Sequence, residues 1–476
     1  MTRFAAWILL VGTTVLIGCQ AGEQSGSVPY SSASPDRAEY VPGELPTPYP
    51  DRIALTWSGD PATSLSVTWR TDLSVDESVA QVALAKAEPS FYTEAKTVEA
   101  STELLDLSEI ENEHVTAHYH SATFAGLQPD TLYAYRVGDG ERWSEWFHAR
   151  TASDQPDPMS FIYFGDAQNN LRSHWSRAIR AAYQHAPDAR FMVHAGDLVN
   201  NAHRNIEWGE WHQAGGFIQA MLPSVPVPGN HEYDEHTEAE REQDIEHLSA
   251  HWRPGFALPM NGARGFKESS YYMDIQGVRV IGLDSDPATD GGDALAVQTA
   301  WLDSVLTNNP NRWTVVTFHH PVFSSSEGRD NPELRAAWKP LFDAHRVDLV
   351  LQGHDHTYAR GQAENLTQGV NARSPAGGTV YVNSVSGAKM YALKPDEWGA
   401  YEPIDLERAA ENTQLFQVIR VDGDTLRFRA YTVTGELYDA FELVNQGNDQ
   451  PSAFSSLMEP GADARTHENT IPYERP

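Results

Sequence analysis

Five clusters of polar residues in this sequence each follow a short run of apolar, β-prone residues. They are Gly165-Asp166-Ala167-Gln168, Gly196-Asp197, Gly229-Asn230-His231-Glu232, His319-His320-Pro321 and Gly353-His354-Asp355-His356. Because the ends of parallel strands meet at one edge of a sheet, we expect these clusters to lie together. Carboxylate and amide oxygens combined with several imidazoles are ligands for divalent metal ions. We therefore predict a site for two such ions, with hydrolysis of a phosphate ester as its chemistry.

None of the clusters is decisive alone. A Gly-Asp pair after a strand is common in turns and helix caps, and Asn230-His231 could be another capped loop. The sequence Gly353-His354-Asp355-His356 is more specific, because two imidazoles two residues apart can bind one metal ion or two adjacent ones. The recurrence of ligand-type residues at one strand end after another is what predicts metal binding.

The segment that carries the clusters, residues 158–388, alternates short apolar stretches with helical ones, which is the pattern of βαβ units. Asp166 and Asp197 are 31 residues apart, and Asp197 and Asn230 are 33 apart, close to the roughly 30 residues of one unit. We expect strands at Ser160–Phe164, Arg190–Ala195, Ser224–Val227, Val278–Leu283, Thr314–Phe318, Asp348–Leu351 and Thr379–Val382. We expect helices at Leu171–His185, Ile206–Met221, Asp234–Trp252, Leu295–Thr307 and Asn331–Ala344.

The chain has 476 residues, which is long enough for more than one domain. Residues 51–152 alternate apolar and polar residues between turn signals, and predict an all-β sandwich of the fibronectin type III kind. Residues 153–446 form the predicted α/β domain, whose last part returns to β patterning that should complete its sheets. We expect a flexible tether at 19–50 and a disordered tail at 447–476, because both are polar and rich in Pro, Gly or Ser.

The only cysteine, Cys19, ends an N-terminal segment typical of export. Arg3 precedes an apolar stretch, residues 5–17, which is too short for a comfortable membrane span. Leu16-Ile17-Gly18-Cys19 resembles the lipobox of bacterial lipoproteins, in which cleavage precedes the cysteine and its thiol is acylated. The resemblance implies a signal peptide at 1–18 and an exported, lipid-anchored protein of the bacterial envelope, in the periplasm, at the outer membrane or on the cell surface. An ordinary signal peptide with an incidental cysteine is the alternative.

The charge of the chain limits its partners. It has 34 Lys and Arg against 66 Asp and Glu, a formal net charge of −32. We expect no nucleic-acid surface, because phosphate backbones require clustered cations. We expect contact with a membrane only through the lipid anchor, and the sequence leaves the oligomeric state open.

The order of the five clusters is similar to that of the calcineurin-like metallophosphoesterase superfamily. The preceding sandwich, with Leu65-Ser-Val-Thr-Trp69 and Leu132-Tyr-Ala-Tyr135, looks like the N-terminal domain of purple acid phosphatases. The resemblance covers residues 51 to about 445. It implies a four-layer α/β fold, a β-sandwich flanked by helices, preceded by the fibronectin-like domain. It also implies two divalent metal ions as cofactors, with Mn, Fe, Zn and Mg as candidates.

The resemblance implies a role for each ligand. Asp197 would bridge both ions; the first ion would also be bound by Asp166 and His356, and the second by Asn230, His319 and His354. His231 would face the substrate and either stabilise the transferring phosphoryl group or protonate the leaving oxygen. His320 lies beside a ligand on a predicted strand, so we expect it to face the opposite way and to be structural or to lie outside the ligands.

Two positions depart from the family pattern. Purple acid phosphatases carry a tyrosine three residues after the bridging aspartate, where this chain has Asn200. Without the phenolate we expect no purple colour. The wider superfamily has Asp-x-His in its first block, where this chain has Gln168, whose amide oxygen we expect to bind the first ion. Oxygen donors suit Mn²⁺, Mg²⁺ or Fe²⁺. A bystander Gln168, with water in its place, is the alternative.

We expect a dimetal-dependent phosphoesterase that hydrolyses small phosphate monoesters, in the manner of an acid phosphatase, by attack of a metal-bridging hydroxide. Arg204 and Arg329 join His231 as candidate substrate-binding residues, although surface arginines are more often simply solvated. A phosphodiesterase or nucleotide pyrophosphatase of the same fold is one alternative. A catalytically dead, metal-stabilised binding protein is another, and it is disfavoured because every ligand and His231 are present.

Overall fold

The computed structural model describes residues 45–363, 378–394, 404–447 and 452–457. The predicted signal peptide, Cys19 and most of the tether and tail lie outside these residues. Within the described ranges, no helix is long and apolar enough to cross a membrane. The prediction of a disordered tail is wrong for residues 453–456, which form strand β24 (Ala453–Ser456) and pair antiparallel with β23 (Leu437–Val444).

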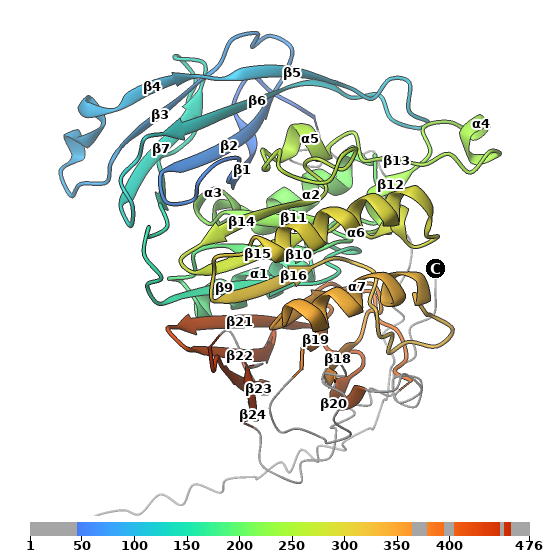
Figure 1. Ribbon diagram of the computed structural model, residues 1–476. Coiled ribbons are helices and arrows are strands. Elements are labelled where there is room, and N and C mark those ends of the chain that lie inside the picture. The colour runs from blue at the N-terminus through green and yellow to red at the C-terminus, as the bar shows by residue number, and fades with distance from the viewer. Residues whose placement is uncertain (1–44, 364–377, 395–403, 448–451, 458–476) are drawn as a thin grey trace, which may run out of the picture. The chain divides into compact units, whose positions relative to one another are not determined.

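The N-terminal part is a sandwich of two four-stranded sheets (Figure 1). One sheet has the order β1 (Asp51–Thr56), β2 (Ser64–Thr71), β6 (Thr116–Ala125) and β5 (Ser101–Asp106). The other has the order β4 (Lys96–Glu99), β3 (Val79–Leu84), β7 (Leu132–Gly138) and β8 (Phe147–Arg150), and the 3-10 helix η1 (Pro89–Glu94) precedes β4. Alternation buries every second side chain, as in β8, and Trp69 of β2 and Trp57 just after β1 are fully buried.

The second part contains two larger sheets, each with seven strands among the described residues. The first sheet has the order β11 (Ser224–Val227), β10 (Met192–Ala195), β9 (Met159–Phe164), β21 (Leu415–Asp422), β22 (Thr425–Thr432), β23 and β24. The second has the order β14 (Tyr271–Ile275), β15 (Val278–Gly282), β16 (Trp313–Thr317), β17 (Leu349–Gln352), β19 (Val380–Asn383), β18 (Tyr358–Ala363) and β20 (Ile404–Ala410). The expectation of a single sheet edge is therefore wrong, because the polar clusters follow strands of two sheets.

Parallel pairing aligns the strands that precede the clusters. β10 pairs in parallel with β9 and β11, and β16 pairs in parallel with β17. These strands are buried along their whole length, as parallel strands covered on both faces are. β21 adds to β9 in antiparallel register and β20 to β18, so the C-terminal β segment completes both sheets as predicted.

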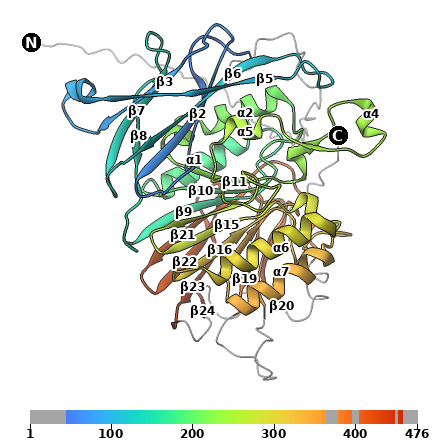
Figure 2. The same cartoon turned by 45° about the horizontal axis from the view of Figure 1, so that its top comes forward.

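Helices cover the outer faces of the two sheets. α6 (Gly292–Thr307) and α7 (Pro332–His345) pack on the second sheet through a cluster that includes Leu302, Val316 and Trp338 (Figure 1). α1 (Trp175–His185) contacts β21 of the first sheet. α2 (Asn205–Gly215), α3 (Phe217–Met221) and α5 (Trp252–Gly255) contact strands of the N-terminal sandwich (Figure 2).

The sandwich is joined to the α/β part by a shared core and by hydrogen bonds. Trp57 contacts Phe191 edge to face, with ring centroids 6.0 Å apart, within one continuous apolar cluster. Arg52 Nη2 donates to the carbonyl oxygen of Asn205, 2.8 Å away, and Thr68 Oγ1 donates to that of Gly255, 2.7 Å away. The sandwich therefore supports the start of α2, close to the loop that follows Asp197.

Two helix predictions were wrong in part. The predicted helix Asp234–Trp252 is instead a hairpin, β12 (Tyr233–Asp234) and β13 (His247–Leu248), with α4 (Glu238–Arg241) at its tip. Its Glu, Ala and Arg residues favour helix, but only α4 forms, because Asp244 takes a left-handed turn at φ 57° and sends the chain back to pair. The predicted helix Ile206–Met221 is divided at Gly216, where φ is 52°.

Candidate dinuclear metal centre

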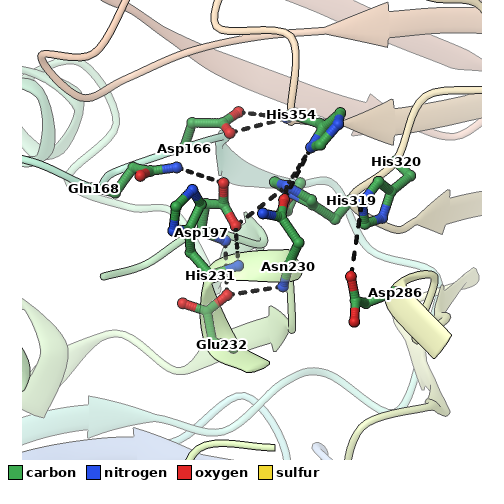
Figure 3. Close-up of polar contacts among 12 residues, drawn as sticks. Asp166, Gln168, Asp197, Asn230, His231, Glu232, Asp286, His319, His320 and His354 are labelled. Carbon is green, nitrogen blue, oxygen red and sulfur yellow. Dashed lines mark hydrogen bonds and ion pairs between the residues drawn. The ribbon is translucent and has the colours of Figure 1, made fainter. Parts of the chain in front are cut away.

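The five polar clusters meet between the carboxyl ends of the two sheets. Asp166 follows β9, Asp197 follows β10, and Asn230 lies in the 3-10 helix η2 (Asn230–Glu232) after β11. From the second sheet, His319 follows β16, and His354 and His356 follow β17. Figure 3 shows the side chains of Asp166, Asp197, Asn230, His319 and His354 gathered at one place. The sequence-predicted ligands are thus brought to one place.

The glycine in each of three clusters leaves room for a ligand from another cluster. A Cβ atom on Gly196 would lie 2.5 Å from His319 Nδ1, and one on Gly229 would lie 2.3 Å from Asp197 Oδ1. A Cβ atom on Gly353 would lie 2.6 Å from Asp166 Oδ2. These Gly-Asp, Gly-Asn and Gly-His pairs are therefore determined by packing at the site as well as by the turn itself.

Four of the ligand-type residues adopt left-handed backbone conformations. The φ angles are 45° for Asp166, 53° for Asp197, 75° for His354 and 51° for His356. Such conformations are uncommon outside glycine and cost on the order of 1–3 kcal/mol each. Their concentration here marks a functional site.

One half of the site is formed by His319, Asn230, His354 and Asp197. His319 Nδ1 donates to the carbonyl oxygen of Ala195, 2.9 Å away, so in the neutral ring Nε2 carries the lone pair. Asn230 Oδ1, Asp197 Oδ1 and His354 Nδ1 all lie 3.0–3.2 Å from another member of this group. Electron-pair donors facing one another at these distances need a proton or a metal ion between them. The donor set therefore fits a divalent metal ion.

The pKa values of His319 and Asp197 also indicate that this group favours positive charge. Burial alone would lower the pKa of His319, but the neighbouring carboxylate of Asp197 raises it to about 9. Burial works against ionisation of Asp197, yet its contacts with His319 and His231 hold its pKa below the usual value. The negative charge of Asp197 thus favours a cation at this position.

The other half of the site contains Asp166, Asp197 and His356, whose ligand atoms lie within 4.8 Å of one another. His356 Nδ1 donates to the carbonyl oxygen of Lys389, 2.7 Å away, which directs Nε2 toward Asp166 Oδ1, 3.5 Å away. Burial, together with the charge of Asp197, raises the pKa of Asp166 to about 8. Two carboxylates and an imidazole, all three buried, again fit a metal site.

Gln168 is fully buried beside this second group. Its amide nitrogen donates to Asp197 Oδ2 and lies 3.3 Å from His356 Nε2, while its oxygen accepts from Lys389 Nζ, 3.2 Å away. The predicted oxygen ligand would require the amide to turn by half a rotation. The role of Gln168 as a metal ligand stays a prediction.

His231 is fixed beside the bridging carboxylate. Its backbone N–H donates to Asp197 Oδ1, 3.0 Å away, and its ring Nδ1 donates to the carbonyl oxygen of Asn200, 2.7 Å away. Nε2 is thereby the atom that is directed at the site. Asn200, which stands where the family has a tyrosine, thus orients the His231 ring through its backbone carbonyl oxygen.

Lys389 is a site residue that the sequence reasoning missed. Its ammonium group lies 3.0 Å from His231 Nε2 and contacts Gln168, and it is half-buried. It lies in the loop after β19, a strand that was predicted. A Cβ atom on nearby Gly387 would lie 2.5 Å from the carbonyl oxygen of Asp166. Lys389 follows the seventh predicted strand, and no ligand-type motif marks it in the sequence.

Two buried carboxylates hold the ligand loops from behind. Glu232 accepts four backbone N–H groups, from Gly229, Asp197, Leu198 and Val199, at 2.8–3.2 Å. Asp355, between His354 and His356, accepts from the hydroxyl of Ser324 and the backbone N–H of Ser325. Neither had been given a role from the sequence.

The remaining candidates lie around the centre. Arg329 Nη1 donates to the carbonyl oxygen of His354, 2.6 Å away, and its guanidinium covers the ring of Tyr391 at 4.8 Å. Arg204 begins α2, and its charge lowers the pKa of Glu113 against the larger, opposing effect of burial. The structure thus places the side chain of Arg329 in direct contact with a ligand loop.

We expected His320 to face away from the site, but its ring lies beside that of His354. Its ring centroid lies 4.3 Å from that of His354, and its Nδ1 is 3.0 Å from Ser285 Oγ. β16 ends at Thr317, so the alternation of a strand no longer applies at His319 and His320. Nε2 lies 3.8 Å from Asp286 Oδ1, which makes His320 a neighbour of the ligands on their outer side (Figure 3).

Comparison with known proteins agrees with this geometry. Residues 50–151 match the family described as the purple acid phosphatase N-terminal domain, and residues 159–358 match the calcineurin-like phosphoesterase family. An uncharacterised protein of Mycobacterium tuberculosis is 25% identical over 407 residues, covering 77% of this chain and 72% of its own. Purple acid phosphatase 18 of Arabidopsis thaliana is 24% identical over 365 residues, covering 74% and 76%.

A solved structure shares the fold. The purple acid phosphatase from yellow lupin seeds superposes with a TM-score of 0.64 at 18% identity, covering 83% of this chain and 74% of its own. Both domains, their order and the ligand set therefore point to one family, whose members use a dinuclear metal centre. The chain belongs to the purple acid phosphatase-like metallophosphoesterases of the calcineurin-like superfamily, and it has Asn200 in place of their tyrosine ligand.

Proposed function

We propose that this dimetal phosphoesterase is a phosphomonoesterase of the acid phosphatase type, acting on small phosphate esters. The observation that carries the proposal is the convergence of Asp197, Asn230, His319 and His354 around one point, with His231 beside them. The related purple acid phosphatases support the same reaction class.

The residues of the chain would divide the work as follows. Asp166 and His356 would hold one cation, Asn230, His319 and His354 the other, and Asp197 would contact both. When bound, two divalent cations lower the pKa of water and offset charge on phosphoryl oxygens. As water attacks phosphorus and the bond to the leaving oxygen breaks, His231 in its imidazolium form, oriented by Asn200, would pass its Nε2 proton to that oxygen. The products are then an alcohol and inorganic phosphate.

The ammonium group of Lys389 favours a monoester substrate over a diester. Lys389 Nζ lies beside His231 Nε2, where it could donate to a phosphoryl oxygen. A monoester carries a second negative charge near neutral pH, whereas a diester carries one charge and a second bulky group. One additional charge-assisted hydrogen bond contributes about 1.5–3 kcal/mol, or roughly 10–100-fold in rate. We therefore expect at least a tenfold preference for the monoester.

Paired substrates with one leaving group test the proposal. The protein is stripped of metal, reloaded separately with Mn²⁺, Zn²⁺, Fe²⁺ or Mg²⁺, and assayed with p-nitrophenyl phosphate and bis(p-nitrophenyl) phosphate. The monoester should have the larger kcat/KM, and the Asp197→Asn variant should lose both activities. A larger kcat/KM for the diester would favour the phosphodiesterase alternative. Activity that survives in Asp197→Asn would overturn the catalytic scheme.

We also propose that the protein is exported and anchored by a lipid on Cys19. The position of the only cysteine after an apolar segment supports this. Expressed with its leader in a Gram-negative host, the wild-type protein should enter the membrane fraction, and Cys19→Ala should remain out of it. Equal partition of the two would contradict the anchor.

A further inference from the structure

The hairpin of residues 233–248 leaves the catalytic loop and returns to it. β12 follows directly after Glu232, and β13 pairs with β12 through Tyr233 with Leu248 and Asp234 with His247. Ser249, which follows β13, donates its N–H to the carbonyl oxygen of Glu232, 2.7 Å away. Both ends of the hairpin are thus attached beside His231, and anything that stiffens the hairpin stiffens that loop.

Three metal-ligand side chains gather within this hairpin. His236 follows β12, Glu240 lies on α4 and His247 lies on β13. One ligand atom from each lies within 4.8 Å of the others, and all three residues are half-buried. The rings of His236 and His247 stack with their centroids 4.2 Å apart, and His247 Nε2 is 3.1 Å from Glu240 Oε1.

The protonation of His236 and Glu240 is compatible with the metal site that their positions suggest. Partial burial and the neighbouring His247 lower the pKa of His236, so this ring is neutral and has a lone pair to offer. The contact with His247 lowers the pKa of Glu240, which keeps that carboxylate ionised. Glu240 Oε2 accepts the backbone N–H groups of His236 and Thr237, at 3.0 and 3.1 Å, and this fixes the carboxylate in place.

The surroundings of the cluster favour a cation. Asp234, Glu235, Glu238 and Glu246 all lie on the same hairpin. The hairpin's only arginine, Arg241, is paired with Glu235, Glu238 and Glu111 rather than with the cluster. His203 supports His236 from one side, with ring centroids 4.6 Å apart, but its two nitrogens contact Asp234 O and Ala250 N. It is therefore a support and not a ligand.

We propose that His236, Glu240 and His247 bind one divalent transition-metal ion, with Zn²⁺ the best match, at a third site separate from the dinuclear centre. Two imidazoles and one carboxylate, with water as the fourth ligand, form a set that Zn²⁺ uses in proteins at bond lengths of about 2.0–2.2 Å. Tetrahedral ligands at such lengths lie about 3.3 Å apart, and the His247–Glu240 pair is already this close. The ion would tie the tip of the hairpin to its returning strand.

Metal counting tests the site without reference to catalysis. Wild type, His247→Ala and His236→Gln are stripped, loaded with Zn²⁺, freed of excess metal and analysed by mass spectrometry for bound zinc. Each variant should bind one equivalent less than wild type. His148→Ala, which changes an exposed histidine on β8, is the matched control and should bind as much as wild type. Equal zinc content in wild type and both hairpin variants overturns the proposal.

A second measurement uses only the wild-type protein, so it remains valid if the variants misfold. Crystals of the full chain soaked in Zn²⁺ should give an anomalous peak between the three side chains at the zinc edge. No peak there, in crystals whose dinuclear centre is loaded, also overturns the third site. Because neither readout uses activity, failure of the phosphomonoesterase proposal would leave this result unaffected.

Discussion

Glu232 offers the sharpest test of how the ligand loops are held. Its carboxylate is fully buried and accepts four backbone N–H groups, two on each oxygen, from Gly229 and Asp197 on one side and Leu198 and Val199 on the other. It therefore joins the loop of the bridging aspartate to the loop of Asn230 and His231. Glu232→Gln changes the charge of this group and leaves its size the same.

The size of the effect follows from these contacts. An amide keeps one acceptor oxygen and places an NH₂ group against the other two N–H donors, so two charge-assisted hydrogen bonds are lost, about 3–6 kcal/mol. Burial, with the charge of Asp197, raises the pKa of Glu232 to about 8. Because the ordinary pKa is 4.5, the buried acid costs the fold about 3 kcal/mol at pH 7, and the substitution recovers this cost. We expect the free energy of unfolding to fall by up to about 3 kcal/mol.

Urea unfolding at pH 7 measures this change. Glu442→Gln is the matched control, because Glu442 forms a partly exposed ion pair with Arg427 whose loss should cost less than about 1 kcal/mol. Metal affinity of Glu232→Gln, measured by titration of the stripped protein, should fall about 10–100-fold, since the loops position Asp197 and Asn230. If Glu232→Gln unfolds like the control and binds metal like wild type, the carboxylate does not hold these loops.

Three further substitutions test other parts of the structure. Gly229→Ala would place Cβ 2.3 Å from Asp197 Oδ1 and 2.8 Å from His319 Cγ, so metal-dependent activity should fall at least about tenfold, and unchanged activity would contradict the packing argument. Lys389→Met should lower kcat/KM for the monoester about 10–100-fold and for the diester less, and an equal loss for both would exclude Lys389 as the source of selectivity. Burial raises the pKa of Asp348 to about 7; the folded chain then binds the extra proton between about pH 4 and 7, so stability falls as pH rises through that window by up to about 4 kcal/mol. Asp348→Asn should remove this decline, and urea unfolding at pH 4.5 and 7.5 that gives the same decline in both proteins would refute it.

The strand ends and their ligands could be predicted because two local patterns coincide there. Short buried strands have a strong apolar signal, and the recurrence of Asp, Asn and His directly after one such strand after another has few structural uses. The predicted strand Ser224–Val227 is strand β11 as the structure has it, and the others differ at their ends by one or two residues. The two-sheet arrangement could not be predicted from strand patterns alone, because pairing of β9 with β21 joins residues more than 250 positions apart.

What the sequence did not predict depends on long-range contacts. The residues after Asp234 have a helical composition, and their return as β13 is decided by pairing with β12 and by the bond from Ser249 to Glu232. Lys389 follows no motif, and only the fold places it against His231. Glu232 was visible as part of a cluster, but a glutamate beside ligands could equally have been a ligand.

The ligand loops support one another in a way that explains how their strained conformations persist. Left-handed φ angles at Asp166, Asp197, His354 and His356 together cost about 4–12 kcal/mol, comparable to the whole stability of a domain. Each carboxylate offsets part of this cost by binding the next loop. Asp166 accepts the N–H of His354 on both oxygens at 2.9 Å, and Asp197 accepts that of His231 at 3.0 Å. The groups that would bind metal therefore also fix the backbone that presents the other ligands, so a change at one ligand should alter the position of its neighbour as well as remove a donor.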